Sequence, residues 1–339
     1  MNILSPLSNV SETIPLIKSG ADELYCGILS NNWKSSHNKI FTPNQRSPSS
    51  ANLKSINELK KVSELTHKYN KKVYLTLNKQ YTKKEFITVK EELPKIINTE
   101  IDAIIVSDIK LIMHLNRIDT GINLHLSTIG AVFNSEACNF LKDYGIKKIT
   151  FPRHIPINDM EIIIKKVKGV KFEAFILNGL CKYIEGFCSY YHGLEKSVAN
   201  KDDAIRRKVK EILSSNFTKS IAKNIPSKII QIASNQNWIK QSDPCEFKCS
   251  SNIKIPTQNN KTMIDCGACS IYDLKNAGVN SIKIVGRENV TQKKIEDVKF
   301  IKNMKKYLHS KDKNEFITRS KKIRENFLGS NCKLGRCYY

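Results

Sequence analysis

The sequence predicts an α/β protein, a (β/α)8 TIM-type barrel with a cysteine-bearing insert after its seventh strand and a C-terminal helical extension. Three observations support this fold class. Short apolar runs alternate with amphipathic stretches, the runs number eight, and they recur about every 25 residues, which suits right-handed crossovers between parallel strands. A doubly wound open sheet would show the same local alternation. The count of eight and the lack of a Gly-rich dinucleotide-binding motif favour the barrel.

The predicted strands are short runs rich in apolar and β-branched residues, bounded by turn residues, polar loops or helices. The run AIIVS at 103–107 is almost continuously apolar, which is typical of a strand covered on both faces. The eight predicted strands cover residues 2–4, 23–27, 73–78, 103–107, 123–128, 148–153, 171–177 and 281–287.

Helices are predicted between these strands, because apolar residues recur there every third or fourth position. We expect Asp108, Asn134, Ser270 and Thr291 to cap four of them, since short polar side chains accept hydrogen bonds from the free N–H groups of a first helical turn. The Ser-, Asn- and Pro-rich stretch 31–52 is predicted to be a long loop. The predicted helices cover residues 11–18, 53–65, 84–97, 108–117, 134–145, 158–168, 270–278 and a last one from 291.

The chain is expected to form one barrel with additions. Its first seven β/α units fall in residues 1–180, the cysteine-rich insert in 181–269, the last helix–strand–helix in 270–308, and a basic extension in 309–339. Its 339 residues are 40% apolar and 26% charged, which is typical of a globular chain. The start MNILSPLSNVSE is neither basic nor apolar, and no apolar run is long enough to span a membrane. We therefore expect a cytoplasmic location and no membrane span.

The chain is strongly basic, with a formal net charge of +24. A positive balance favours binding to RNA or another polyanion. The alternative is that lysine is spread over solvated faces by a biased codon usage. The excess concentrates in residues 290–339, which carry 14 Lys plus Arg against 5 Asp plus Glu, but aromatic residues do not alternate with the charges there. RNA is thus one candidate partner.

Polar residues follow the predicted strands at their carboxyl ends, where the active sites of such barrels lie. Arg153 and Arg287 place two cations at this end, and a guanidinium matches a carboxylate or phosphate in a two-pronged way. An anionic small-molecule substrate is the expected ligand. Ser127 follows the fifth strand, and His125 shares its parity, so both are predicted to face the barrel interior. Further residues at strand ends are Cys26, Asn78, Ser107, Asp108, Thr128 and Asn178.

Several of these residues also have a purely structural interpretation. Asp108 can be a helix cap, Ser127 can satisfy backbone groups, and a lone His125 on a strand can be a hydrogen-bonded core residue. Glu173 and Lys283 lie lower in the seventh and eighth strands and can form a buried ion pair between them.

Cysteines form the strongest functional signal. Thiolates bind soft metals, and four of them suit zinc or an iron–sulfur cluster. Zinc ribbons prefer two C-x2-C pairs, but only Cys266 and Cys269 have that spacing, so a cluster is favoured over zinc and over a site without metal. Disulfides are disfavoured by the close spacing and the lack of a signal peptide. Cys138 is assigned to the core, and the roles of Cys332 and Cys337 stay open. The six candidate ligands are Cys181, Cys188, Cys245, Cys249, Cys266 and Cys269.

The motifs along the chain resemble those of the collagenase-like peptidase family U32. The match runs through most of the predicted barrel and includes the cysteine motifs NGLC, GFC and CEFKC. The other matching motifs are GADELYCG at 20–27, NQR at 44–46 with Asn52-Leu53, VYLTLN at 73–78, AIIVSD at 103–108, LHLST at 124–128 and SIKIVGR at 281–287.

The resemblance implies a chemistry different from the family's name. Relatives in ubiquinone synthesis and RNA modification resemble oxygen-independent hydroxylases with a 4Fe-4S cluster, and prephenate is implied as the oxygen source in several. Carried over by position, the cluster ligands would be Cys181, Cys188, Cys245 and Cys266, with Cys249 and Cys269 as alternative fourth ligands. A protein partner from the same family is a further candidate for completing the site.

With the resemblance, the predicted site has two sets of residues. Arg46, Arg153, Arg287 and Ser127 are expected to bind substrate. The candidates for proton transfer are His125, Asp108 and Asn78.

The chain departs from the family pattern in three places, which leaves the substrate open. Val285 stands where the family has Glu, the gap from Cys188 to Cys245 is long, and the CYY tail lies outside the common motif.

Two other functions compete with hydroxylation. One is a peptidase, although HExxH, GxSxG and C-G-S-C-W motifs are all lacking from the sequence. The other is a non-catalytic cluster protein or RNA-binding protein.

Overall fold

The computed structural model describes the barrel and its helices, with gaps at the cysteine-rich insert and at short loops. The predicted ligands Cys181, Cys188, Cys245 and Cys249 lie outside the described residues. Those residues are 1–37, 42–46, 49–180, 185, 265–309, 312–328, 332 and 336–339.

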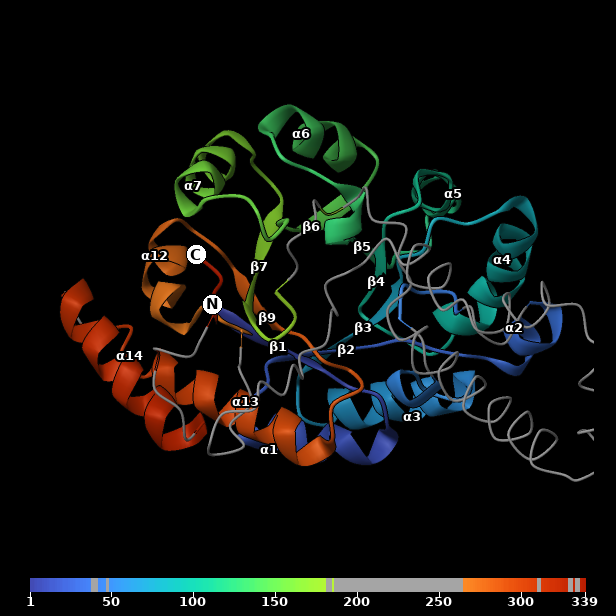
Figure 1. Ribbon diagram of the computed structural model, residues 1–339. Coiled ribbons are helices and arrows are strands. Elements are labelled where there is room, and N and C mark those ends of the chain that lie inside the picture. Colours follow the sequence, from blue (N-terminus) through green and yellow to red (C-terminus); the bar gives the residue numbers. More distant parts are fainter. Residues whose placement is uncertain are drawn as a thin grey trace, which may run out of the picture.

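Eight parallel strands form a closed barrel (Figure 1). Neighbours pair in chain order from β1 to β7, and β9 pairs with both β7 and β1, which closes the sheet. The prediction of a (β/α)8 barrel is confirmed, and the open-sheet alternative is wrong. The barrel strands are β1 (Asn2–Pro6), β2 (Glu23–Cys26), β3 (Lys72–Leu77), β4 (Ala103–Val106), β5 (Asn123–Leu126), β6 (Ile146–Thr150), β7 (Lys171–Leu177) and β9 (Ser281–Ile284).

A ring of helices covers the outside of the barrel (Figure 1). A further helix, α14 (Lys313–Leu328), packs against the last of them and confirms the predicted helical extension. In the described part of the chain, no helix combines the length and apolarity needed to cross a membrane. The ring consists of α1 (Thr13–Ser19), α3 (Ile56–His67), α4 (Lys83–Ile97), α5 (Ile109–Ile118), α6 (Ser135–Asp143), α7 (Ile157–Lys166), α12 (Ile271–Asn276) and α13 (Thr291–Lys305).

The main apolar core lies between the strands and these helices, and includes Leu24, Leu75 and Ile104 from the outward faces of the strands. The barrel interior holds a second, smaller apolar layer, formed by Leu4, Tyr25, Tyr74, Ala103 and Ile105. A third small cluster, Phe175, Val285 and Tyr338, lies at the carboxyl end, and buried charged side chains such as Lys148 and Glu173 occupy the interior between these layers.

The stretch 31–52 differs from the predicted long loop. It begins with a short helix, α2 (Asn31–Ser36), whose N-cap Ser30 accepts a hydrogen bond from Trp33 N at 3.1 Å. Trp33 is fully buried and holds the helix against the molecule. A 3-10 turn, η2 (Ser49–Ala51), follows later. Tertiary burial of one tryptophan thus outweighs the weak helix propensity of Asn and Ser.

Two of the four predicted helix caps make the expected side-chain hydrogen bond. Asp108 accepts a bond from Leu111 N, and Asn134 accepts one from Ala137 N, both at 2.8 Å. Ser270 is the N-cap residue of α12, as predicted, but its side chain makes no capping hydrogen bond. Thr291 is the first residue of α13 rather than its cap, and its hydroxyl donates to Glu12 Oε1 at 2.9 Å.

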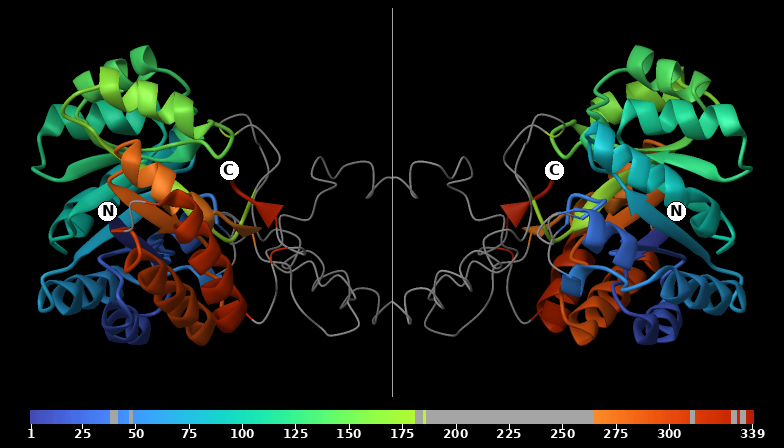
Figure 2. Two further views of the ribbon diagram at one scale, coloured as in Figure 1. Left: turned by 90° about the vertical axis from the view of Figure 1, so that its left-hand side faces the viewer. Right: turned by 90° about the vertical axis from the view of Figure 1, so that its right-hand side faces the viewer.

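Two short strands beyond the barrel were not predicted from the sequence. β8 (Asp265–Cys266) pairs antiparallel with the carboxyl end of β7, at Leu177↔Cys266. β10 (Arg336–Cys337) pairs parallel with β8 (Figure 2). These strands bring the end of the insert and the end of the described chain to the same rim of the barrel.

Candidate active site at the carboxyl ends of the strands

Arg287 lies directly after β9 and is buried among neutral oxygens. Its Nη1 donates to Thr76 Oγ1 at 2.9 Å and to Asn52 Oδ1 at 3.4 Å, and its Nη2 donates to Asn44 Oδ1 at 2.7 Å. Burial lowers the pKa of Arg287 to about 10, so the group is still a cation at neutral pH. The charge of this buried guanidinium has no carboxylate among its direct partners in the described residues.

The glycine at the end of β2 makes room for this guanidinium. A Cβ atom on Gly27 would lie 1.9 Å from Arg287 Nη1 and 2.2 Å from Asn52 Oδ1. Such distances are far below van der Waals contact, so a side chain at this position would force the surrounding side chains to shift. The motif GADELYCG therefore ends in glycine for a packing reason that the sequence alone did not show.

The other two predicted arginines are paired with carboxylates. Arg46 Nη1 lies 2.9 Å from Glu288 Oε1. The Arg153 side chain pairs with Glu185, which also accepts a hydrogen bond from Arg153 N at 2.6 Å. The Arg153 guanidinium carbon lies 3.6 Å from the centre of the Phe175 ring. Its Nε is buried and has no hydrogen-bond partner in the described part of the chain.

His125 faces the barrel interior, as its parity predicted. Its ring packs edge-on against Tyr74, with ring centres 4.5 Å apart. Burial, reinforced by Lys148 and Lys283, holds the pKa of His125 well below its usual range, so the imidazole is neutral. Within the described ranges, neither ring nitrogen has a hydrogen-bond partner. The interpretation as a hydrogen-bonded core histidine is therefore not supported.

Asn78 and Ser127 meet across the end of β4. Asn78 Nδ2 donates to Ser127 Oγ at 3.0 Å, and Asn78 Oδ1 accepts from Gln45 N at 3.4 Å. Asp108, in contrast, uses both carboxylate oxygens on backbone N–H groups, those of Leu111 and Tyr81. Its geometry is that of a structural cap, and its catalytic assignment stays a prediction.

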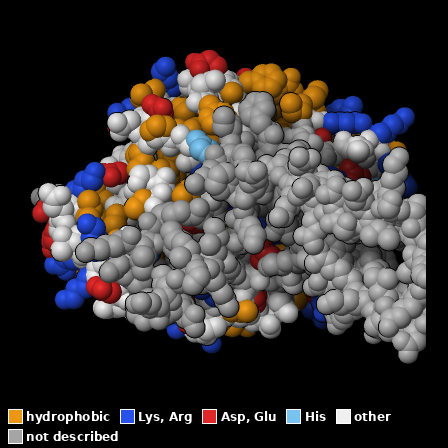
Figure 3. All heavy atoms as spheres, viewed as in Figure 1, with side chains coloured by type: hydrophobic (Ala, Val, Ile, Leu, Met, Phe, Trp, Pro, Cys, Tyr) orange, Lys and Arg blue, Asp and Glu red, His pale blue; other side chains and the backbone are white. Residues whose placement is uncertain are grey.

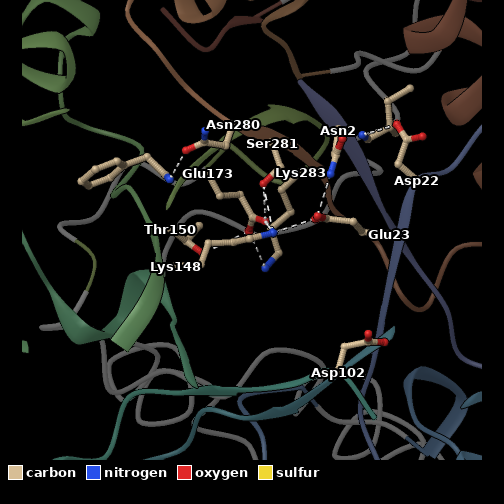
Figure 4. A network of polar contacts seen from close by, with 12 residues as sticks. Asn2, Asp22, Glu23, Asp102, Lys148, Thr150, Glu173, Asn280, Ser281 and Lys283 are labelled. Atoms are coloured by element: carbon tan, nitrogen blue, oxygen red, sulfur yellow. Dashed lines mark hydrogen bonds and ion pairs between the residues drawn. The ribbon is translucent and has the colours of Figure 1, made fainter. Parts of the chain in front are cut away.

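Four charged side chains form a network low in the barrel (Figure 4). The expected Glu173–Lys283 pair is present, with Lys283 Nζ 3.3 Å from Glu173 Oε1. Lys148 Nζ lies 2.7 Å from Glu23 Oε2 and 3.9 Å from Glu173 Oε2. Burial alone would raise the pKa of Glu173, but Lys283 and Lys148 outweigh it and lower that pKa.

Sequence reasoning missed Lys148 and Glu23 in this network, although Lys148 shares its parity with the buried Thr150. The two lysines and two glutamates balance in charge. The network therefore offers no net charge to a ligand.

Two of the six predicted metal ligands can be located. Cys266 lies in β8 and Cys269 in the 3-10 turn η5 (Ala268–Ser270), and both thiols are free. Ala268 N donates to Cys266 Sγ at 3.5 Å, a contact that favours the thiolate. Cys138 is fully buried in α6, which confirms its core assignment. Across the described ranges, no three His, Cys, Asp or Glu side chains already surround a common point that could hold a metal ion.

The CYY tail lies over the mouth of the barrel. Tyr338 packs with Phe175 and Val285, and its hydroxyl donates to the carbonyl oxygen of Asn178. Tyr339 donates to the Phe175 carbonyl oxygen at 3.0 Å. Burial raises the pKa of the Tyr338 hydroxyl, and the charge of Arg153 opposes this effect, so the tail and the predicted substrate-binding arginine lie close together.

Part of the basic charge of residues 290–339 is paired within the chain. Lys294 is fully buried on Glu12, Lys305 lies 3.3 Å from Asp22, and Arg319 pairs with a neighbouring glutamate. Figure 3 shows acidic and basic side chains side by side over the left-hand part of the molecule, where α14 lies. The exposed lysines of this region include Lys299, Lys302, Lys306, Lys321 and Lys322.

Apolar side chains are exposed on the outer helices. Ile109 and Met113 on α5, Phe140 on α6 and Ile162 on α7 are each at least half exposed. Figure 3 shows hydrophobic side chains over the upper part of the molecule, where α6 lies. A same-family protein partner stays a prediction.

Comparison with known proteins gives one family. The family model described as "Peptidase family U32" matches residues 8–330. Among curated proteins, the chain is 27% identical over 188 residues to the tRNA hydroxylation protein P of Helicobacter pylori strain J99, covering 56% of this chain and 42% of that protein. It is 27% identical over 207 residues to the 23S rRNA 5-hydroxycytidine C2501 synthase of Escherichia coli K12, covering 60% and 28%.

A third relative has a different name. The chain is 26% identical over 209 residues to the collagenase of Porphyromonas gingivalis strain W83, covering 59% of this chain and 47% of that protein. The chain thus spans less than half the length of these three relatives. Among solved structures, the U32 peptidase Mk0906 is 12% identical, with a TM-score of 0.40 over 52% of this chain and 69% of that one.

Proposed function

The chain belongs to peptidase family U32, and on that premise we propose that it is an iron–sulfur enzyme that hydroxylates RNA or a small molecule without using oxygen gas. The names of the two RNA-modifying relatives support hydroxylation, and the net charge of +24 is compatible with an RNA substrate. The proposal places binding and redox chemistry at the carboxyl ends of the strands, and proton transfer at His125, the register partner of Lys148 inside the barrel.

The observation that carries the proposal is the environment of Arg287. A guanidinium has five N–H donors, and three of the five are committed to Asn44, Asn52 and Thr76. The remaining donors and the uncompensated charge suit a carboxylate, which pairs with a guanidinium through two N–H bonds. Prephenate, the proposed oxygen source, carries carboxylates. Arg46 and Arg153 stay proposed contacts of the same ligand, although each is already paired with a glutamate.

His125 is the proposed proton acceptor. Its neutral ring has a nitrogen lone pair that no described residue occupies, which a general base requires. Ser127 lies two residues further along the same strand direction, and with Asn78 would orient the substrate by hydrogen bonds. The tail residue Tyr338, packed on Arg153, would limit access of water to this space.

The thiols that the structure describes are compatible with the cluster. Cys266 and Cys269 are free, lie at the rim and have the C-x2-C spacing of a soft-metal site. We propose that Cys181, Cys188 and Cys245 hold a 4Fe-4S cluster together with one of Cys249, Cys266 and Cys269. When bound, the cluster would supply one-electron redox chemistry next to the anion site.

Calorimetric titration with prephenate tests the anion site. We expect wild-type protein to bind prephenate and Arg287→Gln to bind it roughly 10- to 100-fold more weakly, the effect of losing charge-assisted hydrogen bonds worth about 1.5–3 kcal/mol. Arg319→Gln is the matched control, because Arg319 is an exposed arginine in α14. Equal affinity in wild type and Arg287→Gln would remove Arg287 from the site.

Peptide cleavage is the second candidate, favoured by the name of the Porphyromonas gingivalis relative. It requires a nucleophile with a base, or a metal-activated water. Cleavage of a collagen peptide that is lost on replacing one cysteine, with iron content unchanged, would favour this function over hydroxylation.

A further inference from the structure

The chain bends where β7 ends, at Asn178 and Gly179. Their φ angles are 64° and 66°, in the left-handed region that asparagine tolerates and glycine enters freely. A Cβ on Gly179 would also lie only 3.3 Å from Val285 Cγ1. Asn-Gly therefore suits this bend, and Leu180 is the one residue between the bend and Cys181.

Asn178 is held by residues from several elements. Its N–H donates to Asp265 O at 2.9 Å, and its carbonyl oxygen accepts a hydrogen bond from the Tyr338 hydroxyl. Its Nδ2 donates to Val285 O at 3.2 Å and to Asp297 Oδ2 at 2.8 Å. Asp297 is buried on α13, so the bend is tied to the ring of helices as well as to β8. The left-handed conformation is thus fixed by the fold.

Asp265 binds the residue that follows the bend. Its Oδ2 accepts from Leu180 N at 2.8 Å, and the Leu180 side chain packs against the small apolar cluster at the carboxyl end. Asp265 is only 3% exposed, so water competes little for this charge-assisted bond. Asp265 also immediately precedes Cys266, whose backbone pairs with Leu177 on one side and with Cys337 on the other.

We propose that Asp265 is a positioning residue of the iron–sulfur site. It fixes the backbone next to Cys181 through Leu180, and it adjoins Cys266, so each cysteine is one residue away from the same hydrogen bond. One residue adds about 3.8 Å between Cα atoms. Cluster binding then requires less ordering of the chain, because part of the backbone is already in place.

The arrangement favours Cys266 over the two alternative cysteines as the fourth cluster ligand, because its backbone is fixed on both sides. The inference rests on the proposed function, since it presupposes a cluster at Cys181. The bond between Asp265 and Leu180 belongs to the fold and can be tested in protein without iron.

Hydrogen exchange of the full chain, read by mass spectrometry, tests this bond. Peptides that contain Leu180 should be protected in anaerobically purified protein, and also after a chelator has removed its iron. Asp265→Ala removes the acceptor, so exchange at Leu180 should become roughly tenfold faster in both forms, the effect of losing a charge-assisted hydrogen bond. Asp265→Asn keeps an acceptor oxygen and should restore most of the protection. Asp159→Ala, at an exposed aspartate of α7, is the control, and circular dichroism checks that each variant is folded.

Anaerobic release of iron to a chelator tests the role of Asp265 in the cluster site. We expect Asp265→Ala to release iron roughly tenfold faster than wild type, and Asp265→Asn to lie between the two. Cys266→Ser should lose iron and acid-labile sulfide, whereas serine at Cys249 or Cys269 should leave both in place.

Two results would overturn the positioning role while leaving the cluster in place. One is protection of Leu180 that appears only with iron bound, and the other is equal iron release in wild type and Asp265→Ala. Full iron and sulfide content in Cys266→Ser would overturn the choice of fourth ligand. Failure of the proposed function looks different, because wild-type protein would then hold no sulfide whatever the exchange at Leu180, and the positioning role would fall with it.

Discussion

The lower interior of the barrel and its carboxyl-end rim handle buried charge in opposite ways. In the interior, Lys148 and Lys283 each contact a glutamate, so every cation has a carboxylate neighbour. At the rim, Arg287 is equally buried, but its direct partners are the neutral oxygens of two asparagines and a threonine. The interior is complete by itself, whereas the rim holds a positive charge that a ligand can neutralise.

This difference separates buried charges that stabilise the fold from a buried charge that is available to a ligand. A closed set of ion pairs stabilises the fold only if all its members are present, because a single charge left alone inside a protein is costly. A cation held by dipoles is tolerated without a counterion and remains available to an anion. The close packing of Arg287, Asn44 and Asn52 depends on Gly27, so the motif at 20–27 shapes the surroundings of Arg287 by leaving space.

Glu173→Gln should have the largest effect on stability. It removes the carboxylate that Lys283 and Lys148 share, and leaves two buried ammonium groups with one carboxylate. We expect the free energy of unfolding, measured in urea, to fall by about 3–5 kcal/mol. A change below about 1 kcal/mol would mean that water reaches the network, and the contrast between interior and rim would be lost.

Gly27→Ala should lower the free energy of unfolding less than Glu173→Gln does, and it should act on the rim of the barrel. The added methyl group overlaps Arg287 Nη1 and the side chains of Asn52 and Asn44, so these side chains must shift. We expect a loss of about 1–3 kcal/mol in unfolding free energy, as for other overpacked sites. Prephenate affinity should fall in parallel. Unchanged affinity would show that the position of Arg287 is unimportant for binding.

Stability should fall on acidification because of His125. The folded chain keeps this buried ring neutral, so its pKa is far below the usual value, whereas the unfolded chain protonates it below pH about 6.5. The unfolded state then binds more protons, and unfolding free energy decreases by up to about 1.4 kcal/mol per pH unit below that point. His125→Gln should flatten this slope, and the same change at the exposed His154 should not.

Glu161→Gln should have the smallest effect. Its pair with Lys165 is an exposed i,i+4 contact at 2.6 Å on α7. Such pairs contribute about 0.3–0.5 kcal/mol, and salt screens them. Measured in the same urea series as Glu173→Gln, this variant calibrates what an ion pair is worth outside the barrel. A loss above about 1 kcal/mol here would contradict the distinction between buried and solvated pairs.

Periodicity was sufficient to predict the eight barrel strands and the outer helices, because each buries a regular apolar face. It could not predict β8 and β10, which have two residues each and exist only through pairing with distant strands. It also missed α2, where one buried tryptophan decides the conformation of a polar stretch.

The sequence predicted where several candidate residues lie but not which partners they contact. Arg287 and Ser127 lie at strand ends and His125 faces the interior, as expected, and their functional roles stay predictions. The sequence could not show that Arg46 and Arg153 are paired with Glu288 and Glu185, because these contacts join separate segments of the chain. It also gave no sign that Cys337 would pair with Cys266 through β10 and β8.

The central claim is that thiolates from the insert hold an iron–sulfur cluster at the rim of this barrel. Its most direct test is the iron and acid-labile sulfide content of anaerobically purified protein, with its visible absorption spectrum. The account predicts four irons and four sulfides per chain and broad visible absorbance, all lost in Cys181→Ser and retained in Cys138→Ser. Wild-type protein without iron and sulfide after anaerobic reconstitution would contradict it.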